Sequence, residues 1–257
     1  MDTGTKIRYA ASVLFLIILL AAVFFLDKQP KQGANLCTGE PGGNVVILID
    51  YSDDIKETTH KAMKDRIEKL VSDGTKIRPN DRVSVFLLTD NLSKVEPVFD
   101  FCSPITGGNP LISNPEIQAV FQSFFQKKLK DGVSQKPKAV QSSPIIEMIS
   151  TIGRTSYFNE NRRSLIIFSD LLQHSKDSVS LYTACSGGGS PSEKAQAAAL
   201  TYRRNAQSYP PIQLGRDVHV ELHQIPRPEQ KNLQQACLTS FWQDVFGLSV
   251  PSFDPLP

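Results

Sequence analysis

Residues 44–50 read Asn-Val-Val-Ile-Leu-Ile-Asp, an unbroken apolar run that ends in a carboxylate. Residues 163–170, Arg-Ser-Leu-Ile-Ile-Phe-Ser-Asp, repeat this pattern far downstream. Near-continuous apolar runs of this length are typical of strands buried on both faces of a parallel sheet. Segments with helical spacing of apolar residues lie between and after the two runs. The sequence therefore predicts an α/β fold, with an open, mostly parallel sheet and helices on both faces.

The other expected elements complete a sheet of about five strands. Residues 82–89 and 95–101 are strand-like and are separated by turn residues, so we expect them to pair antiparallel. Pro97 places the second of these strands at an edge. The expected strands are 44–50, 82–89, 95–101, 163–170 and 217–225, and the expected helices are 55–73, 115–129, 144–152, 192–209 and 229–246.

Composition and charge exclude several classes of protein. The chain has 257 residues, of which 40% are hydrophobic, which is enough to build a buried core. Its 28 Lys and Arg residues nearly balance its 26 Asp and Glu residues, and a net charge of +2 argues against a nucleic-acid binder. The mean hydropathy of −0.20 excludes a protein with many membrane spans but leaves room for one.

One segment near the N-terminus is apolar enough to span a membrane. Residues 10–26 carry no charge, and they end in bulky side chains where a cleaved signal peptide has small ones. A buried core helix is the other alternative, but it would have a polar face, which this run lacks. We therefore expect an uncleaved, single-pass anchor that holds the chain to the membrane.

The anchor divides the chain into parts. A short tail before a first span normally stays in the cytosol, so we expect the soluble domain outside it, in the periplasm if the chain comes from a bacterium with two membranes. The expected parts are a cytoplasmic tail 1–9, a transmembrane anchor 10–26, a linker 27–43, an α/β domain 44–250 and a C-terminal tail 251–257.

Acidic and hydroxyl side chains gather where the expected strands end. Asp50, Ser52 and Asp54 form a D-x-S-x-D pattern after the first strand, and Asp170 ends the fourth. Ser143 would join them from the loop before a helix. Ligands of open α/β sheets bind beyond the carboxyl ends of the strands, and oxygen ligands of this kind suit Mg²⁺, Mn²⁺ or Ca²⁺. These five residues are the candidate ligands of one divalent cation.

Helix capping is the competing interpretation for three of these residues. Ser52, Asp54 and Ser143 all stand where a side chain can cap the start of a helix. Capping does not account for Asp50 and Asp170 together. A carboxylate at the end of a buried strand needs a cation or hydrogen-bond donors beside it.

These motifs resemble the metal-ion-dependent adhesion site of von Willebrand factor A domains. That family has D-x-S-x-S after its first strand, a Thr-Pro pair before a later helix and an Asp that closes its fourth strand. Asp50 and Ser52 match the first motif, Ser143 stands where the family has Thr, and Asp170 matches the strand-ending Asp. The resemblance covers roughly residues 44–247 and implies a Rossmann-like domain with a divalent cation and protein partners.

Asp54 departs from the family's pattern, which has a second Ser at that position. In the family, the metal keeps enough positive charge to attract an acidic residue of a partner. A third carboxylate lowers that remaining charge. The substitution therefore implies a preference for Ca²⁺, weaker metal bridging to partners, or a site without metal.

The topology that the resemblance implies selects one of the three possible pairings of the four cysteines. Cys37 precedes the first strand and Cys102 follows the third, so both would lie on the amino-end side of the sheet. Cys185 and Cys237 would reach the opposite side. We expect the disulfides Cys37–Cys102 and Cys185–Cys237, and the alternative is four free thiols in a cytosolic domain.

Three hypotheses of function follow. The first is a membrane-anchored, extracytoplasmic, von Willebrand factor A-like protein-binding module of an envelope-associated assembly, with protein partners near the membrane. The second is an extracytoplasmic metal-dependent hydrolase that uses the same acids. The third is a structural subunit with a degenerate, metal-free site. No activated base or nucleophile is identifiable in the sequence, so we do not expect an enzyme.

Overall fold

The structure is a computed structural model, and it describes most of the chain beyond residue 34. The described residues are 15, 17, 35–53, 55–105, 114–135, 142–158, 162–186, 188–205, 212, 214, 218–247 and 251–256, with the side chains of 235 and 236 left out.

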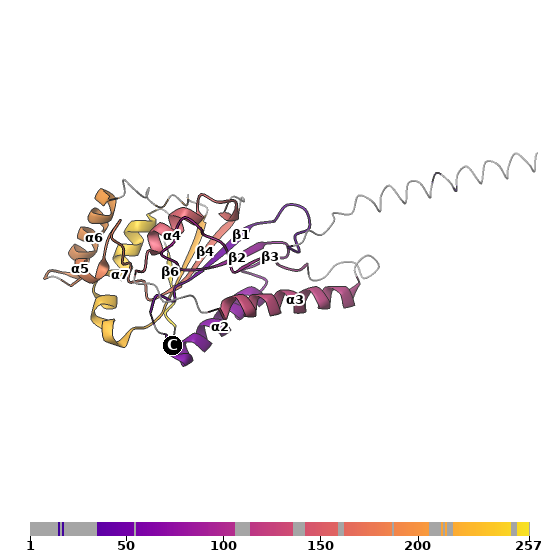
Figure 1. The fold of residues 1–257 in the computed structure, drawn as a ribbon, viewed down its shortest axis with the longest axis horizontal. Coiled ribbons are helices and arrows are strands. Elements are labelled where there is room, and N and C mark those ends of the chain that lie inside the picture. The colour runs from indigo at the N-terminus through magenta and orange to yellow at the C-terminus, as the bar shows by residue number, and fades with distance from the viewer. Residues whose placement is uncertain are drawn as a thin grey trace, which may run out of the picture.

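A six-stranded sheet forms the centre of the fold (Figure 1). Its strand order is β3-β2-β1-β4-β5-β6, and all neighbours are parallel except β2 and β3. β1 and β4 are adjacent, with Ile49 opposite Phe168, so the loops that follow them leave the sheet side by side. The strands are β1 Asn44–Ile49, β2 Arg82–Leu87, β3 Phe99–Cys102, β4 Arg163–Ser169, β5 Val218–Gln224 and β6 Ser252–Phe253.

Helices cover both faces of this sheet (Figure 1). α2 and α3 pack on one face through side chains such as Met63 and Phe125, while α4, α6 and α7 pack on the other through side chains such as Ile146 and Trp242. The predicted α/β class is therefore confirmed. The helices are α2 Glu57–Ser72, α3 Pro115–Val133, α4 Ile145–Ile152, α5 Leu181–Ala184, α6 Pro191–Asn205 and α7 Lys231–Phe246, with 3₁₀ turns at Ser156–Phe158 and Pro228–Gln230.

The sheet has one strand more than the sequence pattern indicates. β6 pairs in parallel with β5 through Ser252 and Phe253, in residues that we expected to form only a tail. Leu256, just beyond β6, is buried on the α2 and α3 side of the sheet. A strand of two residues has no periodic pattern, which is why alternation of apolar residues does not predict it.

Two smaller expectations are also corrected. The third strand begins at Phe99 rather than at residue 95, so Pro97 lies before the strand and not within it. Helix α4 has Pro144 as its N-cap residue, and the backbone N–H of Ile146 donates to Oε1 of Gln173, so Ser143 does not cap the helix. The hydroxyl of Ser143 has another acceptor, described below.

Both expected disulfides are confirmed. Cys37 bonds to Cys102 and joins the residues before β1 to the end of β3. Cys185 bonds to Cys237 and joins the end of α5 to α7. The pairing follows from topology, because each disulfide connects elements that meet only when the sheet is assembled.

The expected anchor, residues 10–26, lies outside the described residues apart from Phe15 and Ile17. In the part of the chain that the structure describes, no helix combines the length and apolar character needed to cross a membrane. The anchor stays a prediction from the sequence.

Candidate functional site

Asp50 and Asp170 lie near each other at the carboxyl edge of the sheet. Asp50 directly follows β1, and Asp170 directly follows the neighbouring parallel strand β4. They are 4% and 5% exposed, so both carboxyl groups are largely withdrawn from water. The structure thus brings the two strand-ending acids to one place, and burial makes each of them depend on nearby donors or cations.

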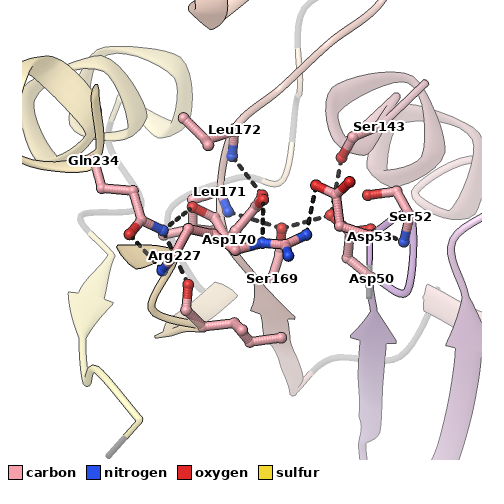
Figure 2. A network of polar contacts seen from close by, with 11 residues as sticks. Asp50, Ser52, Asp53, Ser143, Ser169, Asp170, Leu171, Leu172, Arg227 and Gln234 are labelled. Atoms are coloured by element: carbon pink, nitrogen blue, oxygen red, sulfur yellow. Dashed lines mark hydrogen bonds and ion pairs between the residues drawn. The ribbon is translucent and has the colours of Figure 1, made fainter. Parts of the chain in front are cut away.

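Hydrogen-bond donors surround the Asp50 carboxylate (Figure 2). Its Oδ1 accepts the backbone N–H of Ser52 at 2.8 Å, and its Oδ2 accepts the hydroxyls of Ser143 at 2.8 Å and Ser169 at 2.7 Å. Three donors from three segments compensate for the lost hydration of one buried carboxylate. This role explains why Ser143 does not cap α4.

A guanidinium group links Asp170 to the loop that follows β1 (Figure 2). Arg227 comes from the loop after β5, and its Nε donates to Asp170 Oδ2 at 3.2 Å while its Nη2 pairs with Asp53 Oδ2 at 2.5 Å. The other carboxylate oxygen of Asp170 accepts the backbone N–H of Leu172 at 2.9 Å. The Arg227 side chain is only 16% exposed. Arg227 therefore supplies a largely enclosed positive charge where the acids gather.

Gln234 of α7 holds the Arg227 loop in place. Its Oε1 accepts the backbone N–H of Arg227 at 2.9 Å, and its Nε2 donates to the carbonyl oxygens of Asp170 at 3.0 Å and Ile225 at 2.9 Å. One amide side chain thus connects the residue after β4 with the loop after β5. The position of the guanidinium is fixed by this bridge as well as by its own ion pairs.

Burial and like charges change the ionisation of the site. Burial, followed by the charge of Asp50, raises the pKa of Asp170 to about 7. Burial also lowers the pKa of Arg227, against an opposing effect of Asp50. The pKa of Tyr182 rises to about 12, because the side chain is partly buried and the charges of Asp170 and Asp50 disfavour a phenolate. The carboxyl group of Asp170 therefore has a pKa close to neutral pH.

The described residues, as they are arranged here, leave no room for a divalent cation between Asp50 and Asp170. Both oxygens of Asp50 and both oxygens of Asp170 already accept hydrogen bonds from protein donors. The gap between these carboxylates, Ser52, Asp53 and Arg227 has no space for a water molecule. Among the described residues, no group of three or more His, Cys, Asp or Glu side chains is placed to hold a metal. A cation would first have to displace the guanidinium.

Four of the five candidate ligands lie in this network. Asp50, Ser143 and Asp170 enter it through their side chains, whereas Ser52 enters through its backbone N–H. The fifth, Asp54, lies outside the described residues. The assignment of these five residues as metal ligands stays a prediction.

The sequence interpretation missed four residues of the network. Two of them could have been found in the sequence. Ser169 directly precedes the strand-ending Asp170, and Asp53 lies within the acidic stretch after the first strand. Arg227 and Gln234 could not have been found, since they lie far along the chain and outside any motif. Only the assembly of β4, β5 and α7 brings them to the site.

Comparison with known proteins gives weak similarities only. No family model and no curated protein matches the chain. Proximal thread matrix protein 1 of the mussel byssus is 12% identical with a TM-score of 0.42, over 83% of this chain and 44% of that one. An aerotolerance-related membrane protein of Bacteroides fragilis is 17% identical with a TM-score of 0.39, over 84% and 92% of the chains. BatB, a conserved hypothetical protein of Bacteroides thetaiotaomicron, is 15% identical with a TM-score of 0.39, over 84% and 90%.

The chain thus spans less than half of the length of the mussel protein. At identities and TM-scores this low, none of these similarities decides what the chain does. The function has to be argued from the site.

Proposed function

We propose that this chain is a von Willebrand factor A-like protein-binding module, anchored in a membrane by residues 10–26, whose partner binds at the carboxyl edge of the sheet. We call the residues Ser52, Asp53, Asp170 and Arg227 the rim. The observation that carries the proposal is the convergence of three loops, after β1, β4 and β5, on one ionic network. In open α/β sheets this edge is where ligands bind.

The rim has a buried part and an accessible part. Asp170 and Arg227 are 5% and 16% exposed at their side chains, which fixes their positions. The side chain of Asp53 is 49% exposed and Ser52 is partly exposed, so these two residues are available to a partner. A charged group held at a defined place on a surface favours specific partners through electrostatic complementarity.

The two disulfides support a location outside the cytosol. Disulfides persist in oxidising compartments and are rare where glutathione and thioredoxin keep thiols reduced. Cys37–Cys102 and Cys185–Cys237 therefore agree with an extracytoplasmic domain behind an N-terminal anchor. We propose that the module belongs to an envelope-associated assembly.

The proposed binding does not rest on a resident metal. Arg227 already carries the positive charge that faces Asp53 and Asp170, which supports a metal-free form of the site. The hydroxyls of Ser143 and Ser169 donate directly to the buried Asp50 carboxylate and hold it in place. Both hydroxyls are buried, so neither is open to a substrate, and this favours binding over hydrolysis.

Photo-crosslinking in native membranes tests the proposal. A photoreactive amino acid is placed at Ser52 in the full-length chain, and a matched control carries it at the exposed Lys69 of α2. Lys69 lies in the last turn of α2, whereas Ser52 lies in the loop before that helix. We expect a discrete protein adduct from position 52 and none from position 69. Equal labelling from both positions, or none from either, would contradict a partner surface at the rim.

A further inference from the structure

Helix α3 carries an exposed apolar stripe in its N-terminal half. Ile117, Val120 and Phe124 are 52%, 67% and 39% exposed, and the partly buried Phe121 lies between them. Positions spaced by three and four residues share one side of a helix. The stripe is therefore a continuous apolar surface and not a scatter of single residues.

Contacts along α3 show towards which end of the sheet its N-terminal half extends. At the end of α3, the carbonyl of Val133 accepts the hydroxyl of Tyr51, which follows the carboxyl end of β1. Further back along the helix, Phe124 packs edge-on against Phe101 of β3, with ring centroids 5.7 Å apart. The residues of α3 before Phe124 therefore extend towards the amino ends of β1 and β2, away from the rim (Figure 1). At 1.5 Å per residue, Ile117 lies about 10 Å further along the axis than Phe124.

The chain enters the domain at this same end. The carbonyl of Asn35 accepts the backbone N–H of Cys102 at 2.8 Å, and the Cys37–Cys102 disulfide fixes the entry point beside β3. Only residues 27–34 lie between the expected anchor and Asn35. Eight residues span at most about 28 Å when fully extended. A chain anchored through residues 10–26 thus holds its α3 end close to the bilayer.

We infer that the stripe on α3 contacts the surface of the lipid bilayer in which the chain is anchored; this inference rests on the proposed anchor. Exposed apolar side chains that flank basic residues are typical of helices that bind the interface of a membrane. Lys127 and Lys128 follow the stripe, and the ammonium of Lys128 lies 5.6 Å from the ring centroid of Phe124. Basic groups in this position attract anionic lipid headgroups.

A second copy of the chain is a poorer occupant of the stripe. A stable protein interface buries about 800 Å² on each partner. The three exposed side chains of the stripe fall well short of that area. Contact with a nearby bilayer does not require an apolar surface of that size, because the anchor already holds the domain there. The contact would also orient the domain, so that the rim at the opposite end of the sheet points away from the membrane.

Spin labelling of the full-length chain in liposomes of phosphatidylethanolamine and phosphatidylglycerol tests the inference. The four native cysteines are paired, so Val120→Cys introduces a single reactive thiol. Leu200→Cys is the matched control, because Leu200 is 45% exposed on α6, which packs on the other face of the sheet. Two accessibilities of each label are measured in liposomes and in detergent. One is to oxygen, which concentrates in lipid, and the other is to a water-soluble nickel complex.

We expect the label at 120 to gain oxygen accessibility and lose nickel accessibility in liposomes, and the label at 200 to stay in water. Adding Ile117→Ser and Phe124→Ser should abolish the shift at 120. Extraction of the liposomes with alkaline carbonate shows whether the chain is anchored. If the chain resists carbonate but the labels at 120 and 200 are equally exposed to water, the bilayer contact alone is overturned. Dipolar coupling between the 120 labels of two copies overturns it in favour of a dimer. Release of the chain by carbonate overturns the proposed anchor, and the bilayer contact with it.

Discussion

Replacing Asp170 with asparagine should flatten the dependence of stability on pH. Asp170 has a pKa of about 7 in the folded protein, mainly because it is buried and next because Asp50 is close, against an ordinary value of 3.8. Between these two values the folded state binds more protons than the unfolded state. Stability from this group is therefore fully present below pH 3.8 and is lost as the pH rises through 7.

The size of the effect follows from the shift in pKa. One pKa unit corresponds to about 1.4 kcal/mol, so ionising Asp170 removes about 4 kcal/mol of stability across the whole window, and about 3 kcal/mol of this between pH 5 and pH 8. Asparagine keeps an oxygen for the N–H of Leu172 but cannot ionise. The substitution also removes one ion-pair partner of Arg227. This loss changes the free energy of unfolding by an amount that does not vary with pH, because the guanidinium stays charged.

Urea unfolding at pH 5 and pH 8 measures the effect. The free energy of unfolding of Asp170→Asn relative to that of the unmodified protein should increase by about 3 kcal/mol between these two pH values. Asp177→Asn is the control, because Asp177 is exposed and lies in the same connection after β4. Parallel pH profiles for Asp170→Asn and the unmodified protein would refute the reasoning, since Asp170 would then titrate in the same range whether folded or not.

Three further predictions concern the site and the disulfides. Arg227→Met should destabilise the protein by about 3 kcal/mol at pH 8 in urea unfolding, because it leaves the buried Asp170 carboxylate without its counter-charge. A loss below about 0.5 kcal/mol would show that this ion pair is not formed. Mn²⁺ should not raise the melting temperature of the unmodified protein, because the gap lined by the carboxylates and Arg227 has no space for a water molecule. A rise that Asp50→Ala removes would support the predicted metal site. Reduction should lower the free energy of unfolding by at most about 4 kcal/mol for each disulfide, because the disulfides close loops of 65 and 52 residues in the unfolded chain. An unchanged melting curve in reductant would mean that the thiols are not paired.

Much of the fold could be predicted because it depends on local patterns. The apolar runs at 44–50 and 163–170 are long enough to identify buried strands, and the helical spacing between them indicates an α/β sheet. Once the sheet is assumed, its topology places Asp50 beside Asp170 and selects the two disulfides. β6 escaped prediction because two residues carry no periodic signal and their strand exists only by pairing with β5.

The charge balance of the site was the part that local patterns could not supply. From the sequence, Asp50 and Asp170 are two acids that need a counter-charge, and a divalent cation is the natural candidate. The fold brings Arg227 to Asp170 across 57 positions of the chain and holds it there through Gln234. The sequence by itself determined that a carboxylate would end each of two buried strands, because an apolar run that stops at an Asp is a local pattern. Only the tertiary structure decided that a guanidinium lies beside Asp170, because which charge lies beside a buried acid depends on distance in space and not along the chain.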